Sequence, residues 1–494
     1  MRKQPKEAIL KLICTIGQAH GEIRRQLEQG KLNVARDMLA QCQEAALGIA
    51  NTIEKSEGES CPAIACLLGY CEYLFKVYSN LEMYASAAGG EMEEHLEARL
   101  TQIEDCVKNK IPVRREVVFF PYKISMWDAL ESVYLAAKED PECDVYCVPI
   151  PYFDRNPDGS LGEMHYEGAE YPENVEITDW QTYNFESRRP DVMFIHNPYD
   201  DCNLVTCVHP RFFSRNLKQY TSKLVYIPYF VARYYDNEKT VAQNIPKCID
   251  SVDLCILQSE KQKMGYGITE EYRAKMVVLG SPKLDRIINT VMQLKIPQEL
   301  IKKIGNRKTI LLNSPIPEFL SDPEWEQKIN NIIDLFKKNP KLFLIWRPHP
   351  LLFATMHSMR PKKAECLSEI VQKIDVMDNA LLDQNISADI AIAVSDAMIS
   401  GKSSLILQYT ATEKPVLVTA GSASARENHF VCCDYFSNYF LEDGESIEDF
   451  LSLIIENRDY KREDRMKHFK NSLVNADGSC GKKIYNYVKG LECV

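Results

Sequence analysis

The sequence predicts an α/β protein in which two Rossmann-like domains follow an all-α helical domain. The first 110 residues carry apolar side chains at helical spacing, with almost no strand signal. Short buried strands alternate with helical stretches after residue 113, and the same alternation starts again near residue 308. A chain of 494 residues is also too long for one core and suggests about three domains.

Residues 1–110 are predicted to form a bundle of four helices. Ile9, Ile13 and Ile16 fall on one face of the first helix, and breakers at 56–60 and 88–90 separate the later ones. We interpret the cysteines and aromatic residues of this domain as core packing rather than as a cofactor site. Helical modules of this kind dock or dimerise, so the sequence leaves open a homo-oligomer or a partner bound through this domain.

Residues 111–290 and 291–494 are each predicted to form a parallel sheet covered by helices on both faces, the second with a helix at its C-terminal end. Expected strands in the first domain lie near residues 116–122, 144–150, 191–196, 223–229, 252–257 and 276–280. Two such domains in tandem, facing each other across a cleft, form the arrangement called GT-B. Ligands of these sheets bind outside the carboxyl ends of the strands. The long polar insertion 154–189 is expected to be an irregular loop that binds something.

Composition excludes several classes of protein. The net charge of −11 and the pI of about 5.5 argue against a nucleic-acid binder, which needs clustered Lys and Arg. No apolar run approaches the ~18 residues of a membrane span. The 17 cysteines show no regular spacing and the N-terminus does not resemble a signal peptide, which favours reduced thiols in a cytoplasm. We expect no metal site.

The segment Ser400-Gly401-Lys402-Ser403-Ser404 joins an apolar strand to a helical pattern. Backbone N–H groups at such a junction point out of a helix N-terminus and bind phosphate. The same residues also make an ordinary N-cap turn. The segment is not a Walker P-loop, because that spacing requires glycine at Asp396.

Arg347 and His349 directly follow the predicted strand 342–346. A guanidinium can bind two oxygens of a diphosphate, and an imidazole can donate a hydrogen bond or a proton to the departing phosphate. The alternative is an arginine that caps carbonyl groups beside a surface histidine.

Two further polar clusters follow strands in the first domain. The turn 280–285 presents Lys283 and Asp285, although a plain hinge turn explains it as well. His196 and Asp200 end another strand and could include a general base for a hydroxyl group. His196 could equally be a buried histidine bonded to a backbone carbonyl.

Three segments together resemble motifs of the CDP-glycerol glycerophosphotransferase family, which includes teichoic-acid primases and polymerases. These segments are GSPKLD at 280–285, RPHP at 347–350 and SDAMISGKSSLILQYTATEKPVLV at 395–418. The resemblance covers roughly residues 190–490. It implies a cytoplasmic GT-B enzyme that moves a phospho-alcohol from a CDP-alcohol to an acceptor hydroxyl of a cell-surface polymer, releasing CMP. The CDP-alcohol is a substrate, and no separate cofactor is expected.

The resemblance also implies roles for residues and domains. The first Rossmann-like domain would hold a polyol or glycan acceptor, with the insertion 154–189 as its lip, and the second would hold the nucleotide-linked donor. Arg347, His349, Ser403 and Ser404 would meet the diphosphate, Gln408 the ribose, and Pro415 the loop near the nucleotide. Family polymerases extend lipid-linked acceptors, which suggests peripheral attachment at the inner membrane face. The basic residues near the C-terminus, however, are typical of a solvated helix face.

The chain departs from the family pattern at three places. Ile227-Pro228-Tyr229-Phe230 stands where the family carries Trp-His-Gly with the expected catalytic base. Gly401-Lys402 replaces Asp-Tyr, and Gln408 replaces a glutamate that would accept ribose hydroxyls more strongly than an amide does. Lys402 partly offsets this by adding a cation beside the phosphate site.

The missing Trp-His-Gly leaves three readings of the function open. In a phosphotransferase, the base would be His196, His165 or Asp200. The fold also permits a glycosyltransferase or epimerase that uses a UDP- or GDP-sugar. A nucleotide-binding relative without catalytic activity is the third.

Overall fold

The computed structural model of the chain describes residues 1–86, 89–156, 158–231, 245–266, 269–385, 387–419, 438–441, 444 and 446–491. The chain divides into two compact units. The first unit holds Met1–Glu116 with Asp140–Asp144, and the second holds Val117–Glu139 with Val145–Val494.

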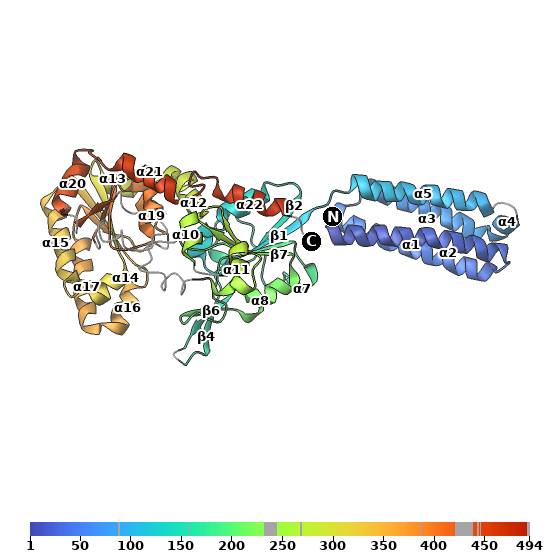
Figure 1. The fold of residues 1–494 in the computed structure, drawn as a ribbon, viewed down its shortest axis with the longest axis horizontal. Helices are drawn as coiled ribbons and strands as arrows, with labels where there is room; N and C mark the ends of the chain where they lie inside the picture. The colour runs from blue at the N-terminus through green and yellow to red at the C-terminus, as the bar shows by residue number, and fades with distance from the viewer. Residues whose placement is uncertain are drawn as a thin grey trace. The chain divides into compact units, whose positions relative to one another are not determined.

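The first unit is a bundle of long helices, drawn in blue in Figure 1. Its helices are α1 (Lys3–Glu28), α2 (Leu32–Glu57), α3 (Pro62–Ser79), α4 (Leu81–Ser86) and α5 (Gly89–Lys110). Both α1 and α3 pack against α2 and α5, so the four long helices enclose one core. Ile9, Ile13 and Ile16 are buried in it, as their spacing predicts. Asn80 separates α3 from α4, where the sequence suggests one helix.

The second unit contains two six-stranded sheets. The first has the order β2-β1-β5-β7-β8-β9. Its strands are β1 (Arg115–Phe120), β2 (Cys143–Cys147), β5 (Val192–Ile195), β7 (Lys223–Tyr226), β8 (Leu254–Leu257) and β9 (Met276–Val278). β1 pairs with β5, β5 with β7, β7 with β8 and β8 with β9, and all four pairs are parallel. Helices near this sheet are α6 (Glu131–Lys138), α7 (Phe185–Arg188), α8 (Ser214–Leu217), α10 (Glu260–Gly265) and α11 (Glu270–Lys275).

The second sheet has the order β12-β11-β10-β13-β14-β15, and its strand pairs are parallel. Its strands are β10 (Lys308–Ser314), β11 (Leu342–Pro348), β12 (Ala380–Leu382), β13 (Ala397–Ser400), β14 (Val416–Val418) and β15 (Tyr439–Phe440). Successive side chains of β10 enter different cores: Ile310 and Leu312 enter one, and Leu311 enters the other. A sheet buried on both faces requires the continuous apolar runs that the sequence shows.

Helices cover both faces of the second sheet. One face packs against α14 (Ile316–Ser321), α15 (Trp325–Lys338), α16 (Leu352–Met359), α17 (Pro361–Asp375) and α20 (Ile447–Ile455). The other packs against α12 (Lys283–Asn289), α18 (Asp389–Val394), α19 (Leu405–Thr410) and α21 (Arg462–Ser472). The predicted fold class, two Rossmann-like domains after a helical domain, is therefore confirmed.

The polar insertion 154–189 is partly regular, which corrects the expectation of an irregular loop. β3 (Tyr152–Arg155) and β4 (Leu161–His165) form an antiparallel hairpin, and β6 (Thr206–Val208) adds a third strand. The side chains of β4 are exposed or half-buried, so this strand lacks the alternation of apolar and polar residues that reveals a strand in sequence.

Two helices link the two Rossmann-like domains of the second unit. α12 follows the first sheet but packs against α19 of the second domain as well as against α6. Arg286 of α12 pairs with Glu131 of α6 and with Asp389 of α18. The C-terminal helix α22 (Cys480–Gly490) returns to pack on α6.

Candidate functional site

The strand order of the second sheet defines where a ligand would bind. β10 is the first strand of this domain, and the chain builds the sheet outward from it in both directions, through β11 and β12 and then through β13 to β15. Open α/β sheets bind ligands at this reversal point, outside the carboxyl ends of the strands. The register places Asn313 of β10 beside both Arg347 and Ser400. The two predicted phosphate-binding segments thus flank one strand end.

The loop that contains Ser400, Gly401, Lys402, Ser403 and Ser404 leaves β13 at this edge. The Asn313 side-chain amide donates to Ser400 Oγ at 2.8 Å, and Ser403 Oγ accepts from the backbone N–H of Leu405 at 3.2 Å. The helix that follows, α19, has only six residues. Any anion affinity here therefore comes from individual N–H and hydroxyl groups rather than from a long helix dipole.

Gly401 faces the carboxyl group of Glu318, a residue of α14 that sequence reasoning missed. A Cβ added at Gly401 would lie 1.7 Å from Glu318 Oε1, so the absence of a side chain at this position leaves room for the carboxyl group. Glu318 accepts hydrogen bonds from the Lys402 backbone N–H and the Thr419 side chain. Burial, and then the charge of Asp322, raise the pKa of Glu318 to about 7.

Arg347 is buried and forms an ion pair of 2.6 Å with Asp383, which lies just beyond β12. This contact agrees with a structural arginine at the strand end, yet it also holds the guanidinium in one place at the candidate site.

His349 lies at the exposed edge beyond β11. Its Nδ1 accepts the backbone N–H of Leu351 at 3.1 Å, so the neutral ring carries its proton on Nε2. Partial burial, and then the charge of Arg347, lower the pKa of His349 below its ordinary value. His349 is therefore a neutral hydrogen-bond donor at pH 7.

Gln408 and Pro415, the two residues expected near the ribose and the nucleotide, do not lie at the same edge of the sheet. Gln408 lies on α19 beyond the loop and is half-buried. Pro415 precedes β14, and its carbonyl accepts the N–H of Met398 near the start of β13. That is the amino edge of the sheet, opposite the loop. The structure corrects the expectation that Pro415 lies near the nucleotide.

His196 ends β5 at the corresponding reversal point of the first sheet, between β1 and β5. Its Nε2 accepts the N–H of Tyr122 at 3.0 Å, and its Nδ1 lies 3.2 Å from the Met126 carbonyl, to which it donates. The side chain is fully buried, which is the main reason that the pKa of His196 is lowered to about 3. With both nitrogens bonded, His196 is a buried structural histidine and has no proton-accepting atom for an acceptor hydroxyl.

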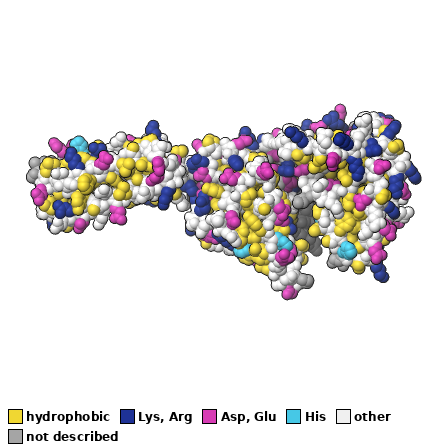
Figure 2. All heavy atoms as spheres, turned by 180° about the vertical axis from the view of Figure 1, so that it is seen from behind, with side chains coloured by type: hydrophobic (Ala, Val, Ile, Leu, Met, Phe, Trp, Pro, Cys, Tyr) yellow, Lys and Arg dark blue, Asp and Glu magenta, His cyan; other side chains and the backbone are white. Residues whose placement is uncertain are grey.

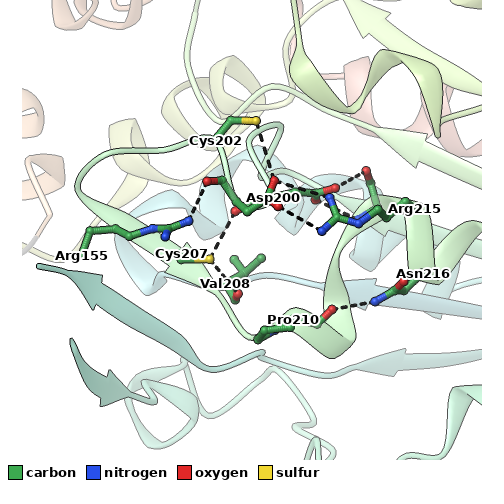
Figure 3. A network of polar contacts seen from close by, with 10 residues as sticks. Arg155, Asp200, Cys202, Cys207, Val208, Pro210, Arg215 and Asn216 are labelled. Carbon is green, nitrogen blue, oxygen red and sulfur yellow. Dashed lines mark hydrogen bonds and ion pairs between the residues drawn. The ribbon is translucent and has the colours of Figure 1, made fainter. Parts of the chain in front are cut away.

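Asp200 is also engaged in holding the fold, as Figure 3 shows. Its carboxylate accepts the backbone N–H of Ser214 at 2.8 Å and the Ser214 hydroxyl at 2.7 Å, at the start of α8. Burial raises the pKa of Asp200 in spite of these bonds. His165 lies apart on β4, where Nε2 pairs with Asp154 at 2.7 Å. The structure therefore does not join the three predicted bases into one cluster.

The turn 280–285 serves the fold, as its hinge interpretation expects. Gly280 has φ of 104°, and a Cβ there would lie 2.3 Å from the Val474 carbonyl. Lys283 is buried against Asp128 at 2.5 Å. Asp285 accepts the N–H groups of Cys480 and Gly481 at the start of α22. Lys283 thus lies in the first domain's packing rather than at the second sheet's edge.

A small pocket lies at the carboxyl ends of β7, β8 and β9, where the family resemblance places Trp-His-Gly. Its lining consists of Ile227, Pro228, Phe230, Ile256, Gln258, Gln262, Gly280, Ser281 and Pro282. The lining contains no titratable side chain. The family resemblance would place a catalytic histidine there, and the lining of this pocket offers no other side chain that could accept a proton in its place.

Across the described ranges, no group of three or more His, Cys, Asp or Glu side chains could hold a metal ion. Among the helices that the structure describes, none combines the length and apolarity needed to cross a membrane. On the face in Figure 2, basic and acidic side chains are interspersed rather than gathered in one basic stripe.

Comparison with solved structures supports the fold. A Listeria monocytogenes protein assigned as a UDP-N-acetylglucosamine 2-epimerase has a TM-score of 0.51 at 13% identity, over 76% of this chain and 96% of that chain. A UDP-GlcNAc 2-epimerase from Neisseria meningitidis, bound to UDP-GlcNAc, has a TM-score of 0.47 at 13% identity, over 76% and 100% of the two chains. The wall teichoic acid polymerase TagF has a TM-score of 0.47 at 13% identity, over 85% and 97%.

These identities establish a shared fold and not a shared chemistry, and of the three only the Listeria structure exceeds a TM-score of 0.5. The chain has the GT-B fold. No family model matches the chain, and no curated protein matches it in sequence.

Proposed function

We propose that the chain is a CDP-alcohol-dependent phosphotransferase whose donor binds at the carboxyl edge of the second sheet. The observation that carries the proposal is the convergence of Arg347, His349 and the loop 400–404 around the end of β10. Guanidinium, imidazole N–H and backbone N–H groups are the donors that a diphosphate needs. The ordered motifs shared with the CDP-glycerol glycerophosphotransferase family favour a CDP-alcohol as that diphosphate.

His349 is proposed to donate a hydrogen bond from its Nε2–H to the phosphate of departing CMP. His349→Ala should lower the rate of CMP release from CDP-glycerol by about 100-fold or more, the usual contribution of one positioned hydrogen-bond donor to developing negative charge. His357→Ala is the matched control, because His357 is also exposed and lies on the neighbouring helix α16. A release rate that survives His349→Ala would overturn the role of His349.

A nucleotide-binding relative without turnover is the second candidate, and specific observations favour it. The pocket at Ile227–Phe230 lacks a titratable group, and His196 and Asp200 are bonded within the fold. CDP stabilisation in a thermal-shift assay without CMP release from any CDP-alcohol would support this candidate. Stabilisation by UDP or GDP but not by CDP would instead favour a nucleotide-sugar enzyme.

A further inference from the structure

The carboxyl group of Glu318 lies inside the loop proposed to bind the donor. It accepts the Lys402 N–H, one of the backbone donors of the loop, and its Oε1 lies against Gly401. Oε1 is buried and has no hydrogen-bond partner in the described part of the chain. A buried oxygen without a partner costs free energy, which a ligand that supplies the missing partner would recover.

Asp322 and Lys328 are the charged groups that act on Glu318, while Lys402, the charged residue of the adjoining loop, is exposed to solvent. On its own segment, Asp322 opposes ionisation, and Asp322 is itself paired with Lys328 of α15 at 2.7 Å. Lys328 favours ionisation, but more weakly than burial and Asp322 oppose it. The one titratable side chain of the adjacent helix α16, His357, is exposed. The pKa of about 7 is consistent with this setting.

An ionised carboxylate and a diphosphate in the same loop would repel each other, and both would compete for the same N–H groups. A protonated carboxyl group removes the repulsion and gains an O–H that can donate to a phosphate oxygen. Since a bound diphosphate makes ionisation of Glu318 still less favourable, binding and protonation must assist each other.

We propose that Glu318 is a donor-binding residue that takes up one proton when the diphosphate binds and donates the resulting O–H to a phosphate oxygen. The balance is a carboxylate, a proton from solvent and the diphosphate, giving a carboxylic acid hydrogen-bonded to the diphosphate. No covalent bond forms or breaks in the ligand. This inference rests on the proposed function, because it assumes that the donor diphosphate occupies this loop.

The test is calorimetric titration of the full chain with CDP-glycerol between pH 6 and 9, in buffers that differ in ionisation enthalpy. CDP-glycerol is suited to this test because its diphosphate is a diester without a titrating group near pH 7. The wild type should take up close to one proton at pH 8.5, and its Kd should rise by roughly tenfold per pH unit above the pKa of Glu318.

Glu318→Gln should bind CDP-glycerol without proton uptake and with a Kd that no longer varies between pH 7 and 9, because its amide donates at every pH. Glu324→Gln makes the same chemical change at an exposed position and should behave as the wild type does. Binding by the wild type without proton uptake, or unchanged uptake in Glu318→Gln, would overturn the inference alone. No binding of CDP-glycerol at any pH would overturn the proposed donor as well.

Discussion

At the scale of a single residue, Glu318 makes the free energy of unfolding of the ligand-free protein depend on pH. Its ordinary pKa of 4.5 rises to about 7 in the fold, so the native state holds a proton that the unfolded chain releases. The contribution is therefore most favourable at low pH and declines as pH rises from 4.5 through 7. Glu318→Gln should raise the free energy of unfolding by about 3 kcal/mol at pH 8.5 and change it little at pH 4.5.

Urea unfolding of the wild type, Glu318→Gln and Glu324→Gln at the two pH values measures this difference. The exposed Glu324 should show little effect at either pH, since surface substitutions stay within about 0.5 kcal/mol. Equal effects of Glu318→Gln at both pH values would contradict a raised pKa and indicate a packing effect instead.

At the scale of elements, one carboxylate fixes the start of the C-terminal helix. Asp285 on α12 accepts the N–H of Cys480 at 3.1 Å and that of Gly481 at 2.7 Å. Asp285→Ala leaves these buried donors of α22 without their acceptor and should cost about 2 kcal/mol of unfolding free energy.

Asp285→Asn keeps one acceptor oxygen and should cost less than Asp285→Ala. Asp334→Ala, at an exposed position on α15, is the control and should be nearly neutral. Urea denaturation measures all three. If Asp285→Ala were as mild as Asp334→Ala, the cap would have no part in holding α22.

At the scale of the whole molecule, each unit carries a buried histidine that makes the unit less stable at acidic pH. Burial lowers the pKa of His20 to about 4 in the helical unit, where Nε2 bonds the Tyr70 hydroxyl at 2.6 Å. His196 in the second unit is lowered to about 3. In the unfolded chain these two histidines take up protons near pH 6.5, whereas in the native units they stay neutral. The free energy of unfolding therefore falls as the pH drops below 6.5.

We expect each unit to lose about 2 kcal/mol of unfolding free energy between pH 7 and pH 5 from its histidine. Hydrogen exchange of the full chain, read by mass spectrometry, follows each unit through its own proteolytic fragments. His20→Gln should abolish the loss in fragments from residues 1–111, and His196→Gln should abolish it in fragments from the second unit, because each unit has its own hydrophobic core. A substitution that altered both units equally would contradict this expectation.

The sequence by itself determined the kinds of elements, because their signals are local. Helical spacing of Ile9, Ile13 and Ile16 revealed the bundle, and the apolar runs of β10 and β11 revealed a sheet buried on both faces. Arg347 and Ser400 could be assigned to one edge from the chain alone, since parallel strands end at the same edge.

Only the tertiary structure decided what each strand-end residue meets. His196 and His349 look alike in sequence, yet packing gives His196 two backbone partners and leaves His349 exposed with Nδ1 bonded. Glu318 and Gly401 lie far apart in the chain, and the packing of α14 beside β13 brings them together. The proton affinity of a carboxyl group depends on such long-range neighbours and on burial, which no local pattern records.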